Sequence, residues 1–149
     1  MIELDNLGMG YSLEQTQLKV LDGINLSVAY GETVAIVGSS GSGKTTLLNL
    51  LGGLDFASSG YVTVAGQDIS ALDEVERGQL RNTYLGFVYQ FHHLLREFTA
   101  LENVCIPAFI GKKSKKETEK RAKEILDFLG LSHRINHKPN ELSGGEQQR

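Results

Sequence analysis

The stretch Gly38-Ser39-Ser40-Gly41-Ser42-Gly43-Lys44-Thr45 fits the pattern G-x-x-x-x-G-K-[ST], which is the P-loop pattern of nucleotide-binding proteins. The five residues before it, 33–37, are apolar and rich in β-branched side chains, which predicts a strand buried on both faces of a parallel sheet. After it, leucines recur at helical spacing until Gly52-Gly53, which predicts a helix that ends there. The motif therefore lies in the order of strand, loop and helix that a P-loop requires.

The residue types in this stretch suit a nucleoside triphosphate. Glycines at 38, 41 and 43 allow the backbone to bring successive N–H groups close to phosphate oxygens, and the following helix points its positive end at them. Lys44 supplies an ammonium group for the β- and γ-phosphates. The Thr45 hydroxyl is placed to bind Mg²⁺, and Thr46 can reach the α-phosphate. The sequence therefore predicts ATP and Mg²⁺ as ligands.

Composition sets the outer bounds on function. The chain has 149 residues, of which 40% are hydrophobic, so it can bury the core of one domain. A net charge of −3 argues against a nucleic-acid surface and against a polybasic membrane anchor. One cysteine excludes an internal disulfide, and no apolar run approaches the roughly 18 residues that span a bilayer. We expect a cytoplasmic protein that contacts a membrane only through a partner.

The first ninety residues predict an α/β core with an antiparallel region at its start. Residues 1–30 are expected to form antiparallel strands, because residues 24–28 alternate apolar and polar side chains as in a half-exposed strand, and residues 60–64 predict a further strand. Residues 84–89 predict another buried strand, which ends at Gln90. Asp73-Glu74 does not follow an apolar strand, so we interpret the pair as the charged start of a helix and not as catalytic carboxylates.

The second half, residues 91–149, predicts a small helical region. The pattern S/T-x-x-E, which forms a capping box at a helix start, occurs at Thr99 to Glu102 and at Ser114 to Glu117, and Gly130 predicts the end of the second helix. Lysines gather near residue 115, but glutamates interleave with them. We therefore interpret this segment as a solvated helix face and not as a nucleic-acid patch.

Aromatic and histidine side chains leave alternatives open. Tyr11 lies among polar residues and glycines, where it could stack on an adenine ring or be an ordinary half-buried tyrosine. His133 and His137 could share a helix face, but Pro139 and neighbouring asparagines indicate a loop. The adjacent pair His92-His93 points in opposite directions. We expect no metal site at these histidines.

The last eight residues, Leu142-Ser143-Gly144-Gly145-Glu146-Gln147-Gln148-Arg149, carry a second motif. Taken alone, they predict a capping box between Ser143 and Glu146 at the start of a helix. Together with the P-loop and Gln90, however, they resemble the ABC transporter ATPases, whose signature is L-S-G-G-Q. This chain differs from that signature at its fifth position, where Glu146 keeps the capping geometry but changes the charge.

The resemblance covers nearly the whole chain and implies a fold and a set of roles. It implies one P-loop ATPase domain of the ABC type over residues 1–149, with an α/β core over 1–90 and a helical subdomain with the signature over 91–149. Two such domains pair head to tail, and each ATP lies between the P-loop of one and the signature of the other. Tyr11 would stack on adenine, and Gln90 would link Mg²⁺ and the attacking water to the membrane partner. The phosphate and Mg²⁺ cradle would consist of Gly38, Ser39, Ser40, Gly41, Ser42, Gly43, Lys44, Thr45 and Thr46, and Ser143, Gly144 and Gly145 would donate to the γ-phosphate across the dimer.

Within the family, residues 85–95 and 98–104 are most similar to the ATPase subunits of bacterial lipoprotein-releasing systems. The pair His92-His93 favours this branch over the macrolide-exporter and cell-division ATPases, which remain the alternatives. Arg96 stands where this branch is expected to have proline. The resemblance implies coupling of ATP binding and hydrolysis to lipoprotein release, with residues 90–101 facing integral membrane permease subunits at the cytoplasmic face of the inner membrane.

Family members continue past the signature helix into an apolar strand that ends in Asp-Glu, the Walker B motif, and then into a histidine. Neither follows in this sequence, so we expect an incomplete ATPase domain that binds nucleotide weakly, does not hydrolyse it alone, and has poor solubility. Two other readings stay open. One is a non-catalytic nucleotide-binding fragment. The other is a soluble ABC-type ATPase acting on nucleic acid or ribosomes, which the acidic balance disfavours.

Overall fold

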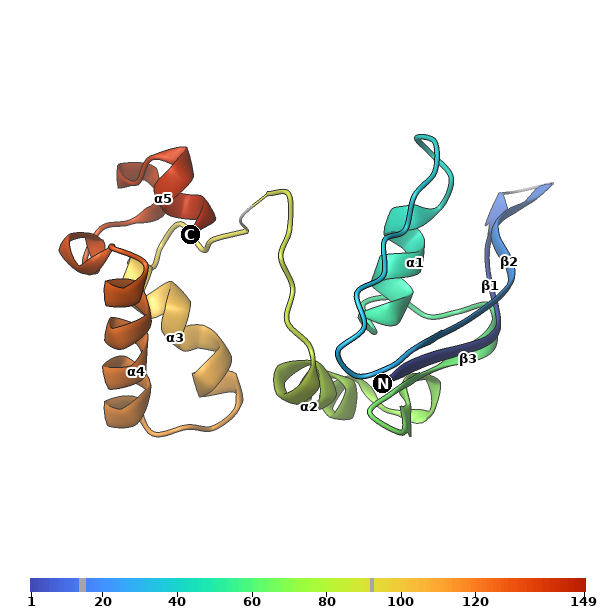
Figure 1. Ribbon diagram of the computed structural model, residues 1–149, viewed down its shortest axis with the longest axis horizontal. Coiled ribbons are helices and arrows are strands. Elements are labelled where there is room, and N and C mark those ends of the chain that lie inside the picture. The colour runs from blue at the N-terminus through green and yellow to red at the C-terminus, as the bar shows by residue number, and fades with distance from the viewer. Residues whose placement is uncertain (14–15, 92) are drawn as a thin grey trace. The chain divides into compact units, whose positions relative to one another are not determined.

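The computed structural model describes residues 1–13, 16–91 and 93–149. The chain forms two compact units, Met1–Leu85 and Gly86–Arg149, which are described separately (Figure 1). No helix in the described part of the chain is long and apolar enough to cross a membrane.

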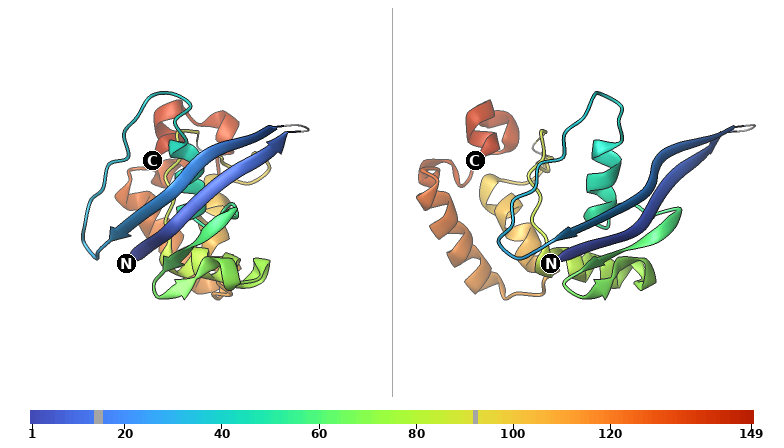
Figure 2. Two further views of the ribbon diagram at one scale, coloured as in Figure 1. Left: turned by 90° about the vertical axis from the view of Figure 1, so that its right-hand side faces the viewer. Right: turned by 45° about the vertical axis from the view of Figure 1, so that its right-hand side comes forward.

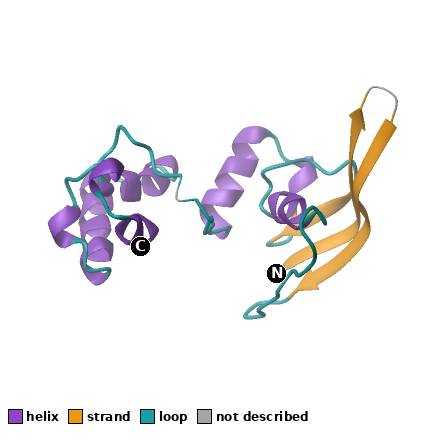
Figure 3. Ribbon diagram, turned by 90° about the horizontal axis from the view of Figure 1, so that it is seen from above, coloured by secondary structure: helices purple, strands orange, loops and turns teal. Residues whose placement is uncertain are grey.

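The first unit is built on an antiparallel sheet of four strands in the order β2-β1-β3-β4. Its strands are β1 (Ile2–Leu13), β2 (Thr16–Val28), β3 (Ser59–Val64) and β4 (Gln67–Asp68). β1 and β2 form a long curved hairpin, visible from two sides in Figure 2, and β3 lies along the other edge of β1 (Figure 3). The predicted antiparallel start and the predicted strand near residue 60 are confirmed.

Helix α1 (Lys44–Leu51) covers one face of this sheet, as predicted from the leucine spacing after the P-loop. Leu47 and Leu50 are its buried residues, and their side chains join the apolar core of the unit. Each fully buried side chain of that core stabilises the fold by roughly 1.5–3 kcal/mol, because its apolar surface is removed from water. The core consists of Leu4, Leu7, Met9, Leu21, Leu47, Leu50, Val62, Val64, Ile69 and Leu80.

Two predicted buried strands are not formed, and those predictions are wrong for this structure. Residues 33–37 have no strand pairing, and Val37 is 86% exposed. Residues 85–89 are likewise unpaired, Val88 is fully exposed, and Tyr84 belongs to a helix. An extended segment becomes a strand only when a neighbour satisfies its N–H and C=O groups. No strand in the described part of the chain pairs with either segment.

Helix α2 (Glu74–Tyr84) closes the first unit after the short 3₁₀ turn η1 (Ile69–Ala71). The Asp73 carboxylate accepts from the Glu76 N–H, and the Glu76 carboxylate accepts from the Asp73 N–H, so the interpretation of Asp73-Glu74 as a helix start is confirmed. Arg77 is buried, with 3% of its surface exposed, and its guanidinium is hydrogen-bonded to Glu74. The guanidinium carbon lies 3.6 Å from the centroid of the Phe56 ring.

The second unit is helical. Its helices are α3 (Ala100–Ile110), α4 (Lys115–Phe128) and α5 (Gly144–Gln148), with 3₁₀ turns η2 (Ser132–Arg134) and η3 (Pro139–Glu141) between the last two. The Thr99 capping box is present in full. At Ser114, the hydroxyl caps the Glu117 N–H, but the Glu117 carboxylate bonds to that hydroxyl instead of to the backbone. Gly130, at φ +71°, ends α4 as predicted.

Candidate nucleotide site

The P-loop folds around the ammonium group of Lys44. Its Nζ donates to the backbone oxygens of Gly38 and Ser39 at 3.0 and 2.6 Å, and the Ser42 hydroxyl oxygen lies at 3.5 Å. The loop is also closed on itself, because the Ser42 N–H donates to the Ser39 oxygen at 3.3 Å. The hydrogen bonds from this ammonium group to neutral carbonyl oxygens can be replaced by bonds to an anion, because hydrogen bonds between two charged groups are stronger. The structure therefore shows a lysine already aimed into the loop.

The start of α1 has unpaired N–H groups beside this lysine. The first hydrogen bond of the helix runs from the Leu47 N–H to the Gly43 oxygen at 2.8 Å, and Gly43 provides no side-chain cap. The three N–H groups of Lys44, Thr45 and Thr46 therefore have no protein partner within the described residues. N–H groups at a helix start, together with the helix dipole, favour an anion at this position.

Two glycines of the loop adopt a backbone conformation that other residues avoid. Gly41 has φ +79° and Gly43 has φ +86°. A Cβ at Gly41 would meet nothing within 4 Å, whereas a Cβ at Gly43 would lie 3.0 Å from Leu21 Cδ2 and 3.2 Å from the Val20 oxygen. Gly43 is therefore required both by its backbone angle and by the close approach of β2.

Tyr11 lines an open depression of the same unit. Its side chain is 44% exposed, and the depression has a volume of about 440 Å³. Leu21, which packs against Gly43, lines the depression as well. The wall consists of Gly8, Met9, Gly10, Tyr11, Leu18, Lys19, Leu21, Ser58 and Ser59. The structure thus gives Tyr11 an exposed face within the unit that carries the P-loop.

The signature residues lie at the start of α5 in the second unit. Ser143 and Glu146 form the predicted capping box, with the Glu146 N–H donating to Ser143 Oγ at 3.3 Å and the Ser143 N–H donating to Glu146 Oε2 at 2.8 Å. Gly144 and Gly145 are exposed, with open space where a Cβ would stand. Ser143, Gly144 and Gly145 therefore form one exposed turn.

Arg134 fixes the charged residue of the signature. Its Nε donates to Glu146 Oε1 at 2.8 Å, while one terminal nitrogen lies 3.3 Å from His137 Nε2. The hydrogen bonds from Ser143 and then the bond from Arg134 lower the pKa of Glu146 to about 2. Sequence analysis did not identify Arg134. Its only sequence signal is a cation twelve residues before an unexpected glutamate.

Gln90 lies in an exposed bend of the second unit. The Phe87 and Tyr89 rings just before it stack with their centroids 5.6 Å apart, and the His93 ring meets the Tyr89 ring edge-on, with their centroids 5.0 Å apart.

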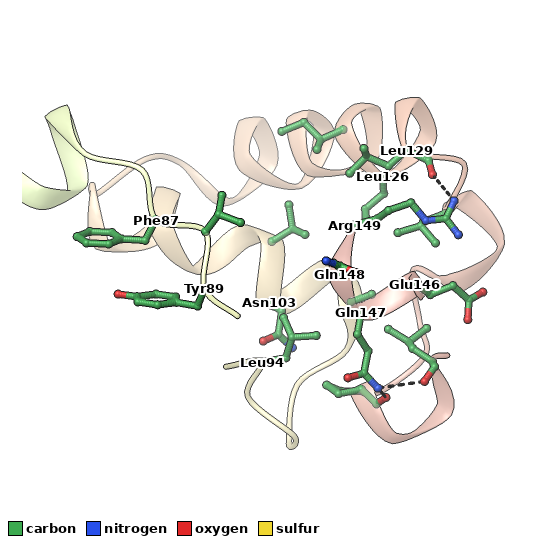
Figure 4. Close-up of a pocket in the computed structure, with 17 residues that line it drawn as sticks. Phe87, Tyr89, Leu94, Asn103, Leu126, Leu129, Glu146, Gln147, Gln148 and Arg149 are labelled. Carbon is green, nitrogen blue, oxygen red and sulfur yellow. Dashed lines mark hydrogen bonds between the residues drawn. The ribbon is translucent and has the colours of Figure 1, made fainter. Parts of the chain in front are cut away.

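An apolar cavity of about 330 Å³ is lined by residues that include Tyr89 and Glu146. Figure 4 shows the Gln147 amide and the Arg149 guanidinium at this cavity, each bonded to a backbone oxygen.

Asn103 is a second positioning residue that the sequence did not reveal. Its Nδ2 donates to the backbone oxygens of Leu95, Phe98 and Thr99 at 3.0–3.1 Å, and its Oδ1 accepts from the Leu95 N–H at 2.9 Å. One amide side chain therefore holds the loop that follows Gln90 against α3.

The predicted residues divide between the two units. The P-loop residues and Tyr11 belong to the first unit, and Gln90 and the Ser143 turn belong to the second. His133 and His137 lie in a 3₁₀ turn and the loop after it, which agrees with the loop interpretation, whereas His92 lies outside the described residues. Among the residues that the structure describes, no three metal-binding side chains cluster.

Comparisons with known proteins converge on one family. The family model described as ABC transporter matches residues 21–149. The lipoprotein-releasing system ATP-binding protein LolD of Pseudomonas syringae pv. tomato is 60% identical over 144 residues, which are 97% of this chain and 63% of that protein. LolD of Xanthomonas campestris pv. campestris, strain 8004, is 57% identical over 148 residues, which are 99% of this chain and 62% of that protein.

A solved structure matches with similar coverage. The dimeric structure of the ATP-binding cassette MJ0796 bound to ADP and Pi superposes with a TM-score of 0.88 at 40% identity, covering 99% of this chain and 66% of that one. The predicted ABC-type fold is confirmed by this likeness. The chain spans just under two thirds of the length of the proteins that it matches.

Proposed function

This chain belongs to the ABC transporter family, and from this premise we propose that it is the ATP-binding subunit of a transporter that releases lipoproteins from the bacterial inner membrane. The substrate class is supported by the relatives named LolD, which are lipoprotein-releasing ATP-binding proteins. The nucleotide is supported by the geometry of the P-loop.

One observation carries the nucleotide proposal. The Lys44 ammonium lies within hydrogen-bonding distance of loop oxygens, next to three helix N–H groups that have no partner in the described part of the chain. These donors fit the β- and γ-phosphates of ATP, and the exposed Thr45 hydroxyl is free to bind Mg²⁺ in the first turn of α1. Bound Mg²⁺ would neutralise phosphate charge. Thr46 would reach the α-phosphate, and Tyr11 would stack on the adenine.

The signature turn serves a second copy of the chain in this proposal. Ser143, Gly144 and Gly145 are exposed, so the Ser143 hydroxyl and the N–H groups of the two glycines would donate to a γ-phosphate held by the P-loop of another copy. The matched MJ0796 structure is described as dimeric and bound to ADP and Pi, which supports the pairing of two copies; we infer that they pair head to tail. Glu146 would position the turn through Arg134 without touching the phosphate.

The permease would contact the second unit near Gln90. The exposed side chains of Phe91 at 71%, Leu95 at 46% and Phe98 at 41% form an apolar surface on the loop that Asn103 fixes. We place this surface against integral membrane subunits, so that the chain works at the cytoplasmic face of the inner membrane. Gln90 would couple Mg²⁺ and the attacking water to those subunits.

Nucleotide binding by the full 149-residue chain tests the proposal first. Titration with a fluorescent ATP analogue and Mg²⁺ is expected to saturate, and Lys44→Ala is expected to weaken binding roughly 10-fold to 150-fold, because it removes a charge-assisted bond. Lys120→Ala, which removes an exposed lysine of α4 in the second unit, is the matched control and leaves affinity unchanged. Equal affinities for wild type and Lys44→Ala would overturn the assignment.

Purification from bacterial membranes tests the partner. The tagged chain is expected to retain an integral membrane permease. Replacement of the exposed Phe91 and Leu95 by serine is expected to release it without changing ATP affinity. Retention of RNA or ribosomes, with no membrane protein, would favour the soluble ATPase class instead.

A further inference from the structure

Figure 1 shows the turn that joins α3 to α4. This turn carries an exposed set of apolar and basic side chains that the transporter role does not use. Phe109 and Ile110 end α3, and their side chains are 42% and 60% exposed. Four lysines follow within six residues, and all are exposed. We call this set the hairpin tip, and it consists of Phe109, Ile110, Lys112, Lys113, Lys115 and Lys116.

The positive charge continues along α4. Residues 112–123 contain seven cationic and two acidic side chains, a net charge of +5 in a chain whose net charge is −3. Glu119 compensates only Lys115, at 3.7 Å. Lys115, Lys116, Lys120 and Lys123 line one open depression on the helix surface with Glu119. The interleaved glutamates therefore do not cancel the local charge, although the overall charge of the chain argued against a basic surface.

Local hydrogen bonds hold the hairpin tip in place. The Lys112 N–H donates to the Phe109 oxygen and the Lys113 N–H to the Ala108 oxygen, both at 2.9 Å, which ends α3 in a tight turn. Lys112 adopts φ +57° in this turn, a conformation that favours glycine. The lysines thus extend from a fixed turn.

We propose that the hairpin tip binds the surface of a membrane that contains anionic phospholipids. Lysine ammonium groups are attracted to lipid phosphates, and the exposed Phe109 and Ile110 side chains suit the boundary between headgroups and acyl chains. This contact goes beyond the proposed function, because it needs neither nucleotide nor permease.

The composition of the hairpin tip favours lipid over nucleic acid. Ile110 is the more exposed of its two apolar residues and offers nothing to a phosphate backbone or to a base. Arginine, which pairs with phosphate and bases in two-bond geometry, is absent from the six residues of the tip. Arg121, further along α4, is bonded to Glu124 at 3.1 Å.

Vesicle co-sedimentation of the full chain tests the proposal. Binding to vesicles of phosphatidylglycerol and phosphatidylcholine is expected, with little binding to phosphatidylcholine alone. Each lysine near an anionic surface contributes about 1 kcal/mol, or roughly fivefold in the binding constant. The variant Lys112→Gln/Lys113→Gln is therefore expected to bind at least about tenfold more weakly. The matched variant Lys19→Gln/Lys138→Gln, which loses two lysines elsewhere, is expected to bind like wild type.

A second variant separates lost binding from lost folding. Lys112→Gly removes one charge but relieves the left-handed backbone at that position. It is expected to fold at least as stably as wild type and to bind anionic vesicles about fivefold more weakly.

Three outcomes would overturn the proposal. They are equal binding to both vesicle types, wild-type vesicle binding by Lys112→Gln/Lys113→Gln, and binding to double-stranded DNA that exceeds binding to anionic vesicles. Failure of this proposal would leave ATP binding intact, and failure of ATP binding would leave vesicle binding intact, so the two are distinguishable.

Discussion

Arg134 donates a hydrogen bond from Nε to Oε1 of Glu146 over 2.8 Å and so joins η2 to the signature turn. Glu146 also accepts from the Ser143 N–H at 2.8 Å, and His133 Nε2 lies 3.9 Å from the same carboxylate. The carboxylate of Glu146, at the fifth signature position, is therefore held both by the turn at Ser143 and by η2. Its capping role would also suit glutamine, whereas its ion pair with Arg134 requires the charge of the carboxylate.

The lowered pKa of Glu146 predicts an acid-sensitive contribution to stability. Hydrogen bonds from Ser143, then from Arg134, lower this pKa from 4.5 to about 2. A lowered folded-state pKa stabilises the fold above the unfolded-state pKa, and this stabilisation is lost as pH falls from about 4.5 to 2. The difference in unfolding free energy between wild type and Glu146→Gln should shrink over this range in urea titrations followed by circular dichroism. A constant difference would contradict the assignment.

Gly43 should tolerate alanine less well than Gly41. Both have positive φ, which costs a residue with a Cβ about 1–2 kcal/mol, but only Gly43 is also crowded by Val20 and Leu21. Gly41→Ala is expected to lower the unfolding free energy by about 1 kcal/mol, and Gly43→Ala by clearly more. Urea unfolding measures both. Equal losses would show that the contact with β2 adds nothing.

The stacking role of Tyr11 can be separated from phosphate binding. If Tyr11 covers adenine, Tyr11→Ala should weaken ATP binding by about 1–3 kcal/mol, while Tyr11→Phe keeps the ring and the affinity. Inorganic triphosphate has no base, so its binding to wild type and Tyr11→Ala should be the same. Isothermal titration calorimetry measures all of these affinities. A similar loss for triphosphate would mean that Tyr11 acts through the fold.

Asn103 should be important for the order of the loop after Gln90. Its side chain makes four hydrogen bonds to that loop, each worth about 0.5–1.5 kcal/mol, so Asn103→Ala is expected to cost about 2 kcal/mol. Hydrogen exchange at the Leu95 amide should accelerate. Asn136→Ala, at an exposed turn residue, serves as the control and should change neither quantity.

The exposed, extended segment around Val88 should promote self-association. Val88, which stands between Phe87 and Tyr89 in sequence, is fully exposed, and its backbone groups have no strand partner among the residues described. An exposed extended segment with unpaired N–H and C=O groups can pair with the same segment of another chain. Val88→Lys should therefore reduce the concentration-dependent mass seen by light scattering. Unchanged association would place the contact elsewhere.

Local signals predicted the elements that depend on neighbours in sequence. The P-loop helix, the start of α2 at Asp73 and the end of α4 at Gly130 follow from caps and spacing within a few residues. The state of residues 33–37 could not be predicted in the same way, and the strand expected there is not formed. The composition of this segment is that of a strand, but strand formation depends on a partner elsewhere in the chain.

The sequence by itself determined the family, through the P-loop, Gln90 and the signature turn, because the chemistry of phosphate binding restricts which residues can stand at each position. It also determined the antiparallel start, the starts of α2 and α3 and the end of α4. Only the tertiary structure decided that Lys44 points into its own loop, that Arg134 holds Glu146 and that Asn103 holds the loop after Gln90. These contacts join residues from different turns and elements, and chain folding sets the distances between them.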